Sequence, residues 1–218
     1  MTARSRVGIL GGTFDPIHLG HLEAASSAQR ALSLDRVLLM PSRTPPHRTA
    51  EPRASVFHRF AMAALAAAES GMSVSDIEVR REGPSYTALT LETLHRDGFA
   101  PTQLFFIAGS DAFADVASWY HYPRILQLAN FVVVARPGAP PPAVLIGHPD
   151  SLIPNHQSLI PGAPKVYSVE ANTPDVSSTD IRRRVGAGES IDGLVPSSVA
   201  GHIRRHHLYV PAPIAAVL

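Results

Sequence analysis

Short apolar runs recur along the chain, separated by longer segments in which apolar and polar residues alternate. A strand covered on both faces of a sheet is typically such a run, because none of its side chains meets water. Four runs predict buried strands, over Val7–Leu10, Val37–Met40, Leu104–Ala108 and Phe131–Ala135, and Lys165–Val169 predicts a further short strand. A less regular alternation over Val74–Val79 predicts one more strand.

Segments with apolar residues every three or four positions predict helices between these runs. The predicted helices follow Pro16 and Ser177 and cover Arg53–Ala68, Ala88–Arg96, Ile125–Leu128 and Pro196–His206. Strands that alternate with helices indicate an α/β fold with right-handed parallel crossovers. In such sheets ligands bind beyond the carboxyl ends of the strands, so the loops that follow the strands are the places to search for chemistry.

Length, composition and charge indicate the number of domains and exclude some kinds of partner. A chain of 218 residues that is 45% hydrophobic suits one α/β domain over 1–218, with an irregular proline-rich segment at 138–164 and a C-terminal helical part at 178–207. The net charge of +1 gives no general argument for binding nucleic acid or a membrane, and we expect neither partner. The absence of cysteine excludes disulfides and thiolate zinc sites and is compatible with a cytoplasmic protein. The apolar run that follows Arg4 and Arg6 is too short for the core of a signal peptide, and no uninterrupted apolar stretch has the length of a membrane span.

The first predicted strand leads into the segment with the most chemistry, Val7–Leu22. Gly11 and Gly12 predict a tight turn that a phosphate can approach, followed by a helix N-terminus, which favours anions. His18 and His21 are three positions apart and would face the same anion from the first helical turn. They could instead be a helix cap or surface residues. A metal site is disfavoured because no third ligand stands at helical spacing, so we expect no metal-ligating residues.

Other strand ends carry further candidates. The loop at Pro41–Arg48 contains Arg43 and Arg48, which are either solvated or able to reach a triphosphate. Asp111 comes after a buried strand and Gly109, and suits either a ribose or a helix N-cap. Trp119, the single tryptophan, suits either a core anchor or stacking on a heterocycle.

Two more helix starts are rich in polar groups. In Gly83–Thr87, Ser85 or Thr87 can cap the helix that follows, or the backbone amides can receive a carboxylate. Near the C-terminus, Ser177 and Asp180 have the spacing of a capping box. Arg182 then lies in the first turn of that helix, where a guanidinium can bind phosphate oxygens.

Two separated motifs resemble one enzyme family. GGTFDPIHLGH matches the GGxFDPxHxGH pattern of the HxGH nucleotidyltransferases, and SSTDIR is similar to their ISSTxIR element. Between them PPHR, GPSYT, GSD, a tryptophan and RPG follow in an order that resembles bacterial nicotinate-mononucleotide adenylyltransferases. The resemblance implies a Rossmann-like, doubly wound parallel sheet with helices on both faces. It also implies transfer of AMP from ATP to nicotinate mononucleotide, which gives deamido-NAD (nicotinate adenine dinucleotide) and pyrophosphate in NAD biosynthesis, with Mg²⁺ bound through the ATP phosphates.

The same resemblance assigns roles to individual residues. The catalytic residues would be His18, His21, Arg48 and Arg182. The ATP-binding residues would be Gly11, Gly12, Thr13, Phe14, Gly20, Gly109, Asp111, Ser178 and Thr179. The nicotinate mononucleotide-binding residues would be Tyr86, Thr87, Trp119 and Arg136. Arg48 replaces the lysine usual in PPHK, which keeps the charge and changes the donor geometry.

Two other functions remain open at this point. Phosphopantetheine adenylyltransferases share the HxGH and SSTxIR motifs but are less similar to GPSYT and RPG. A nucleotide-binding sensor without turnover is the non-enzymatic alternative. The sequence leaves open whether the chain forms a homo-oligomer.

Overall fold

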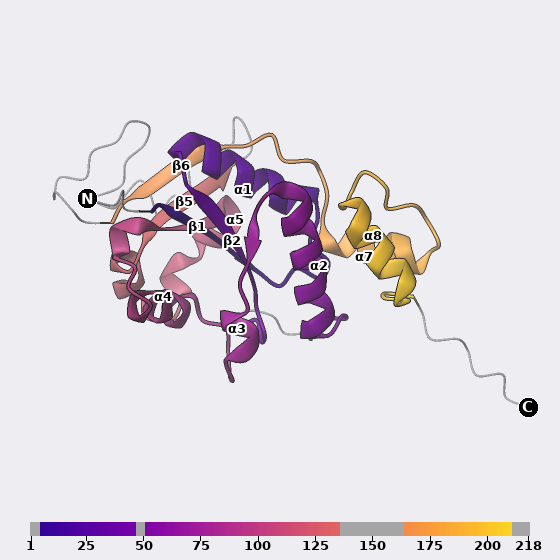
Figure 1. Ribbon diagram of the computed structural model, residues 1–218, viewed down its shortest axis with the longest axis horizontal. Coiled ribbons are helices and arrows are strands. Elements are labelled where there is room, and N and C mark those ends of the chain that lie inside the picture. Colours follow the sequence, from indigo (N-terminus) through magenta and orange to yellow (C-terminus); the bar gives the residue numbers. More distant parts are fainter. Residues whose placement is uncertain (1–4, 47–50, 136–163, 211–218) are drawn as a thin grey trace, which may run out of the picture.

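The computed structural model describes residues 5–46, 51–135 and 164–210, and Figure 1 shows their arrangement. Six strands form one sheet in the order β3-β2-β1-β4-β5-β6. Their bounds are β1 Val7–Gly12, β2 Arg36–Pro41, β3 Ser73–Val74, β4 Leu104–Gly109, β5 Asn130–Ala135 and β6 Val166–Glu170. Every pairing is parallel, and the order runs outward in both directions from β1 and β4. The predicted doubly wound parallel sheet is therefore confirmed.

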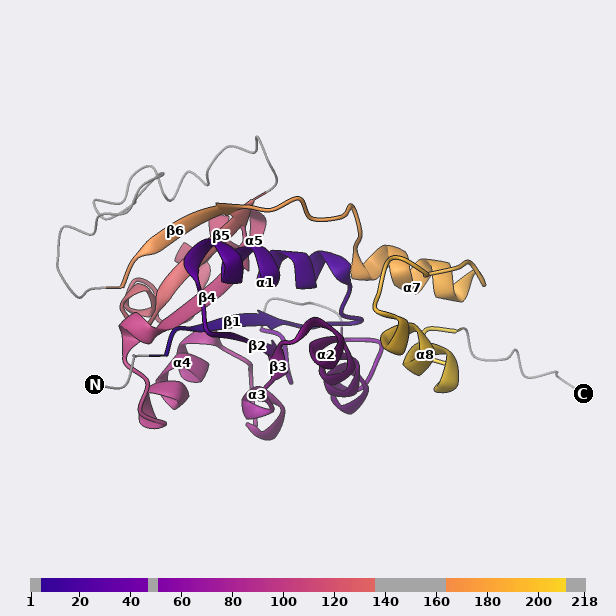
Figure 2. The same cartoon turned by 45° about the horizontal axis from the view of Figure 1, so that its top comes forward.

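Helices connect the strands and extend the chain beyond β6. The α-helices are α1 Leu19–Leu32, α2 Val56–Ser70, α3 Ile77–Arg80, α4 Thr87–Arg96, α5 Ser110–Ala114, α7 Ser178–Gly186 and α8 Ser197–Arg205. Short 3-10 helices cover η1 Pro101–Gln103, η2 Val116–Ser118 and η3 Arg124–Gln127. Figure 2 shows α1 and α4 on opposite sides of the sheet. Within the described ranges, every helix is too short or too polar to cross a bilayer.

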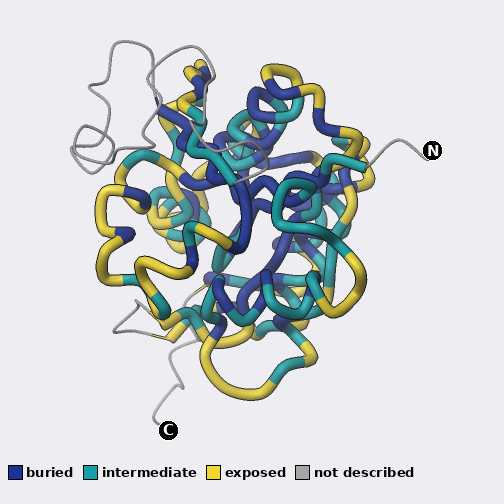
Figure 3. The backbone as a smooth tube through the Cα atoms, turned by 90° about the vertical axis from the view of Figure 1, so that its left-hand side faces the viewer, coloured by how far each residue is buried: buried dark blue, intermediate teal, exposed yellow. Residues whose placement is uncertain are grey.

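Side chains from alternate strand residues belong to two separate apolar clusters, one on each face of the sheet. Leu10 and Ile107 point into the cluster with α1, α2 and α8, whereas Ile9 and Phe106 point into the cluster with α4 and the segment around η3. The central strands consequently lie in the buried interior of the molecule (Figure 3). This two-sided burial explains why the strands are continuous apolar runs in the sequence.

Two of the predicted elements have a different form. The strand predicted over Val74–Val79 is wrong beyond Val74, because the chain turns into α3, where Ile77 packs on the second cluster and Glu78 is buried. The helix predicted at Ile125–Leu128 is the 3-10 helix η3, which begins directly after Pro123. By contrast the helix predicted over Arg53–Ala68 is present as α2, and the Ser55 hydroxyl caps it by accepting from His58 N at 3.3 Å.

A buried arginine on α2 holds the loops that follow β1 and β2. Arg59 is 1% exposed, and its guanidinium donates to backbone carbonyl oxygens at 2.6–3.2 Å. The acceptors are those of Thr13, Ser42, Arg43 and Ala54. A buried carbonyl without a donor is costly, so Arg59 fixes the backbone at the carboxyl ends of two strands.

We expect Arg59→Met to lower the free energy of unfolding by about 3 kcal/mol, because the apolar side chain leaves these carbonyls without donors. Arg36→Met is the matched control, since Arg36 is exposed at the start of β2 and should lose less than about 1 kcal/mol. Urea unfolding followed by circular dichroism measures both. Equal losses in the two variants would contradict this role for Arg59.

Candidate active site

A cavity of about 640 Å³ opens at the carboxyl ends of β1, β4 and β5, where the strand order changes direction. Most residues expected at a nucleotide site lie around it. Those that line the cavity are Gly11, Gly12, Thr13, His18, Gly20, His21, Tyr86, Thr87, Gly109, Asp111 and Trp119. The topological switch point is the usual place for a ligand in such sheets.

The glycine pair is not the turn that the sequence predicts. Gly11 and Gly12 are the last two residues of β1 and pair with Met40 and Pro41 of β2. A Cβ on Gly12 would lie 2.7 Å from the ring of Phe14, so this glycine makes room for an aromatic ring. The chain turns at Phe14, whose φ is +51°. Phe14 is buried and does not line the cavity, and its ring lies edge-on to His21 with centroids 5.1 Å apart.

The two histidines converge as predicted. His18 is the N-cap residue of α1, and His21 lies in the first turn. Their rings are stacked with centroids 3.7 Å apart, and His18 N donates to His21 Nδ1 at 3.3 Å. A Cβ on Gly20 would lie 3.1 Å from His18 Nδ1, so glycine at this position lets the His18 ring pack closely against the helix.

His18 is neutral near pH 7. Burial lowers its pKa to about 4 because the imidazolium would lose its hydration. Its Nδ1 is buried and has no hydrogen-bond partner among the described groups. Near neutral pH His18 is therefore an imidazole with one N–H donor, not a fixed cation.

The loop before α4 is held in a different way from the one expected. Tyr86 is the N-cap of α4 and makes no side-chain capping bond, so the prediction that Ser85 or Thr87 caps this helix is wrong. The Ser85 hydroxyl instead accepts from Arg43 N at 2.9 Å, which ties this loop to the loop after β2. The Tyr86 amide donates to Pro84 O at 3.0 Å.

Asp111 and Trp119 line the cavity from the segment that follows β4. Gly109 is the N-cap of α5 and Asp111 is exposed in its first turn, so the N-cap alternative for Asp111 is wrong. Trp119 is half-buried, packs edge-on to Phe106 with centroids 5.9 Å apart, and also lines the cavity. It is thus both a core contact and a wall of the cavity.

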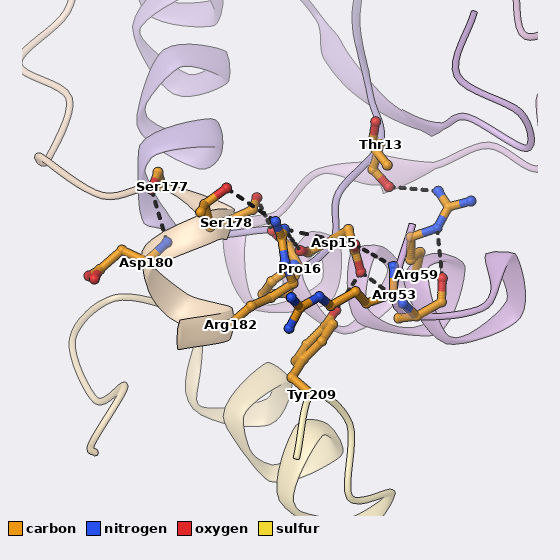
Figure 4. A network of polar contacts seen from close by, with 12 residues as sticks. Thr13, Asp15, Pro16, Arg53, Arg59, Ser177, Ser178, Asp180, Arg182 and Tyr209 are labelled. Carbon is orange, nitrogen blue, oxygen red and sulfur yellow. Dashed lines mark hydrogen bonds and ion pairs between the residues drawn. The ribbon is translucent and has the colours of Figure 1, made fainter. Parts of the chain in front are cut away.

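The start of α7 contacts the loop between β1 and α1, as Figure 4 shows. Ser177 is the N-cap, and its hydroxyl accepts from Asp180 N at 3.1 Å, as predicted. Ser178 Oγ donates to Pro16 O at 2.9 Å, and Arg182 Nη1 donates to Asp15 O at 2.7 Å. The two helix N-termini therefore meet at one loop, although they are far apart in the sequence.

Not every expected residue lies in the wall of the cavity. Among the described residues, Ser178, Thr179 and Arg182 contact the β1–α1 loop or each other and are absent from the cavity lining. The side chain of Arg43 donates to Val79 O at 3.1 Å, toward α3. Arg48 and Arg136 lie outside the described residues.

Four residues that the sequence analysis did not select contribute to the site or its support: Asp15, Arg59, Glu78 and Tyr209. Glu78 lines the cavity; burial raises the pKa of its carboxyl group, which accepts from Thr90 Oγ1 at 2.6 Å. Two of these four residues could have been selected from the sequence. Asp15 lies inside the motif GGTFDPIHLGH, and Arg59 is a charged residue on an otherwise apolar helix face.

The comparisons agree with this geometry. A family model for cytidylyltransferase-like proteins matches residues 9–184. The "Probable nicotinate-nucleotide adenylyltransferase" of Roseiflexus sp. is 44% identical over 204 residues, which cover 93% of this chain and 97% of that protein. The protein of the same name from Thermus thermophilus is 43% identical over 205 residues, with 94% and 99% covered.

A solved structure supports the fold. The Plasmodium falciparum nicotinic acid mononucleotide adenylyltransferase complexed with NaAD superposes with a TM-score of 0.69 at 17% identity, over 94% of this chain and 97% of that one. At this identity the likeness concerns the fold, while the curated relatives establish the family. The chain belongs to the cytidylyltransferase-like family and, within it, to the nicotinate-nucleotide adenylyltransferases.

Proposed function

We propose that this chain transfers AMP from ATP to nicotinate mononucleotide, giving nicotinate adenine dinucleotide and pyrophosphate. The observation that carries the proposal is the meeting of two helix N-termini, those of α1 and α7, at the loop beside the cavity. Helix N-termini favour anions, and a triphosphate is an extended anion that two of them can hold at once.

The reaction needs little acid–base help from the protein. An oxygen of the mononucleotide phosphate attacks the α-phosphorus of ATP, the bond to the β-phosphate breaks, and pyrophosphate leaves. The attacking phosphate is already an anion at neutral pH, so no general base has to take a proton. Catalysis then depends on aligning the two phosphates and on stabilising the charge that develops on the leaving group.

Each side of the cavity has a proposed task. His18 and His21 donate N–H groups to the triphosphate, and Arg182, with Arg48 outside the described residues, balances its charge. Asp111 beyond β4 accepts from the ribose hydroxyls of ATP, and Trp119 stacks on the pyridine ring. The Thr87 amide and the Tyr86 amide, which exchanges its bond to Pro84 O for the ligand, receive the nicotinate carboxylate together with Arg136. N–H donors suit a carboxylate and are partly mismatched with a carboxamide, so the acid is the preferred substrate.

Magnesium is proposed to enter with ATP. Within the described residues no group of three His, Asp or Glu side chains is placed to hold a metal ion. The phosphate oxygens themselves are the hard donors that Mg²⁺ prefers, and the bound ion would neutralise part of their charge. Protein residues then need only to orient the phosphates.

Pyrophosphate release from ATP tests the function directly. We expect turnover with nicotinate mononucleotide at least tenfold above that with the amide mononucleotide, and none with phosphopantetheine. Turnover with phosphopantetheine alone would assign the other adenylyltransferase activity, and tight ATP binding with no pyrophosphate from any acceptor would indicate a sensor.

We expect His18→Ala to lower kcat/KM for ATP by a factor of about 10² to 10³, because a preorganised donor to the triphosphate is lost. His207→Ala is the control, since His207 is exposed beyond α8 and should stay within twofold of wild type. Steady-state kinetics at saturating nicotinate mononucleotide measure both. Unchanged kinetics in His18→Ala would remove this histidine from the catalytic site.

His18 also predicts how stability depends on pH. Its folded pKa of about 4 lies below the model-peptide value of 6.5, so the unfolded chain binds more protons between these values. Stability is complete above pH 6.5 and falls as the pH drops toward 4. Between pH 7 and pH 5 this one residue should cost about 2 kcal/mol, and His18→Gln should lack that loss. Denaturant unfolding at the two pH values measures it; parallel changes in both proteins would contradict the buried neutral state.

A further inference from the structure

The C-terminal segment reaches the site through one tyrosine. Tyr209 follows α8, and its side chain turns back into the protein, with 9% of the residue exposed. Its hydroxyl donates to Asp15 Oδ1 at 2.9 Å across 194 positions of sequence (Figure 4). Burial and the Asp15 carboxylate raise the pKa of Tyr209, so the hydroxyl keeps its proton and remains a donor.

The Asp15 carboxylate that accepts from Tyr209 also faces Arg182. The Asp15 carboxylate is 1% exposed, and its Oδ2 lies 3.8 Å from Arg182 Nη1. The same Nη1 donates to Asp15 O at 2.7 Å, and Arg182 Nη2 donates to Thr179 Oγ1 at 3.1 Å. The direction of the Arg182 guanidinium therefore depends on where Asp15 lies.

Asp15 also anchors the loop that leads to His18 and His21. It is three residues before His18, and its carboxylate accepts from Arg53 N at 2.9 Å and from Ala54 N at 3.1 Å. A carboxylate with several donors is held in one orientation only while all of them are present. Tyr209 supplies the donor that comes from the C-terminal segment.

We propose that Tyr209 is a positioning residue for ATP: its hydroxyl orients the Asp15 carboxylate, which in turn fixes Arg182 and the loop that leads to His18. The inference rests on the proposed function, because it assigns the triphosphate to the two helix starts. It adds a residue that touches no substrate and acts through others. The effect should fall on ATP and leave nicotinate mononucleotide, whose proposed contacts lie at Tyr86, Thr87 and Trp119.

Tyr209→Phe separates the hydroxyl from the ring, which packs in the first apolar cluster. We expect kcat/KM for ATP to fall about tenfold, as for a lost hydrogen bond to a charged group, and KM for nicotinate mononucleotide to change less than twofold. Tyr167→Phe is the matched control, because Tyr167 lies on β6 at the edge of the sheet, and we expect its kinetics to match wild type. A lower melting temperature for Tyr209→Phe with wild-type kinetics at 25 °C would overturn the proposal.

A double-mutant cycle tests the route through Arg182. If Tyr209 acts on ATP through this arginine, Tyr209→Phe should have little further effect in an Arg182→Ala background. A further tenfold loss in the double variant would show that the two residues act independently, and would contradict the proposed route.

The proposed function can fail separately from this inference. If the wild-type enzyme releases no pyrophosphate with nicotinate mononucleotide, the reaction assigned to the site is wrong. Calorimetric titration with a non-hydrolysable ATP analogue then reports on Tyr209 alone. Binding about tenfold weaker in Tyr209→Phe than in Tyr167→Phe supports the positioning role, and equal binding overturns it.

Discussion

The Asp15 carboxylate lies between segments of the chain that are far apart in sequence: the β1–α1 loop, the turn before α2, the start of α7 and the C-terminal segment. It accepts from Tyr209 Oη, Arg53 N and Ala54 N and faces the Arg182 guanidinium. If the buried carboxylate lost these partners, the free energy of folding would become less favourable by several kcal/mol. The contacts of the four segments with Asp15 therefore depend on one another. The relative placement of the two helix N-termini depends on this carboxylate together with the bonds from Ser178 and Arg182 to the backbone oxygens of Pro16 and Asp15.

Some polar groups around the cavity hold the backbone of its loops in place, and others are exposed to a ligand in the cavity. Arg59 and Asp15 are almost fully buried and bind the backbone of the loops, whereas Asp111 is exposed at the cavity. His18 stands between these classes, because it is buried enough to stay neutral and still lines the cavity. Phosphoryl transfer depends chiefly on positioning, which explains why so many buried bonds serve the backbone of two loops.

The strands, the crossovers and the convergence of the histidines could be predicted from the sequence, because each depends on local pattern. The short apolar runs indicate buried strands, and the spacing of His18 and His21 places both at the start of one helix. The glycine turn was wrong because the need for glycine comes from the ring of Phe14, which packs back against Gly12. The contact of Tyr209 with Asp15 has no local signal, since only the tertiary fold brings the two residues together.

Hydrogen–deuterium exchange in Asp15→Asn tests most directly whether one carboxylate holds these segments together. Peptides covering residues 13–18, 53–56, 178–184 and 205–210 should all exchange faster than in wild type, by about tenfold or more, while peptides of β4 and β5 stay unchanged. Faster exchange confined to residues 13–18, or exchange equal to wild type in every peptide, would contradict the account.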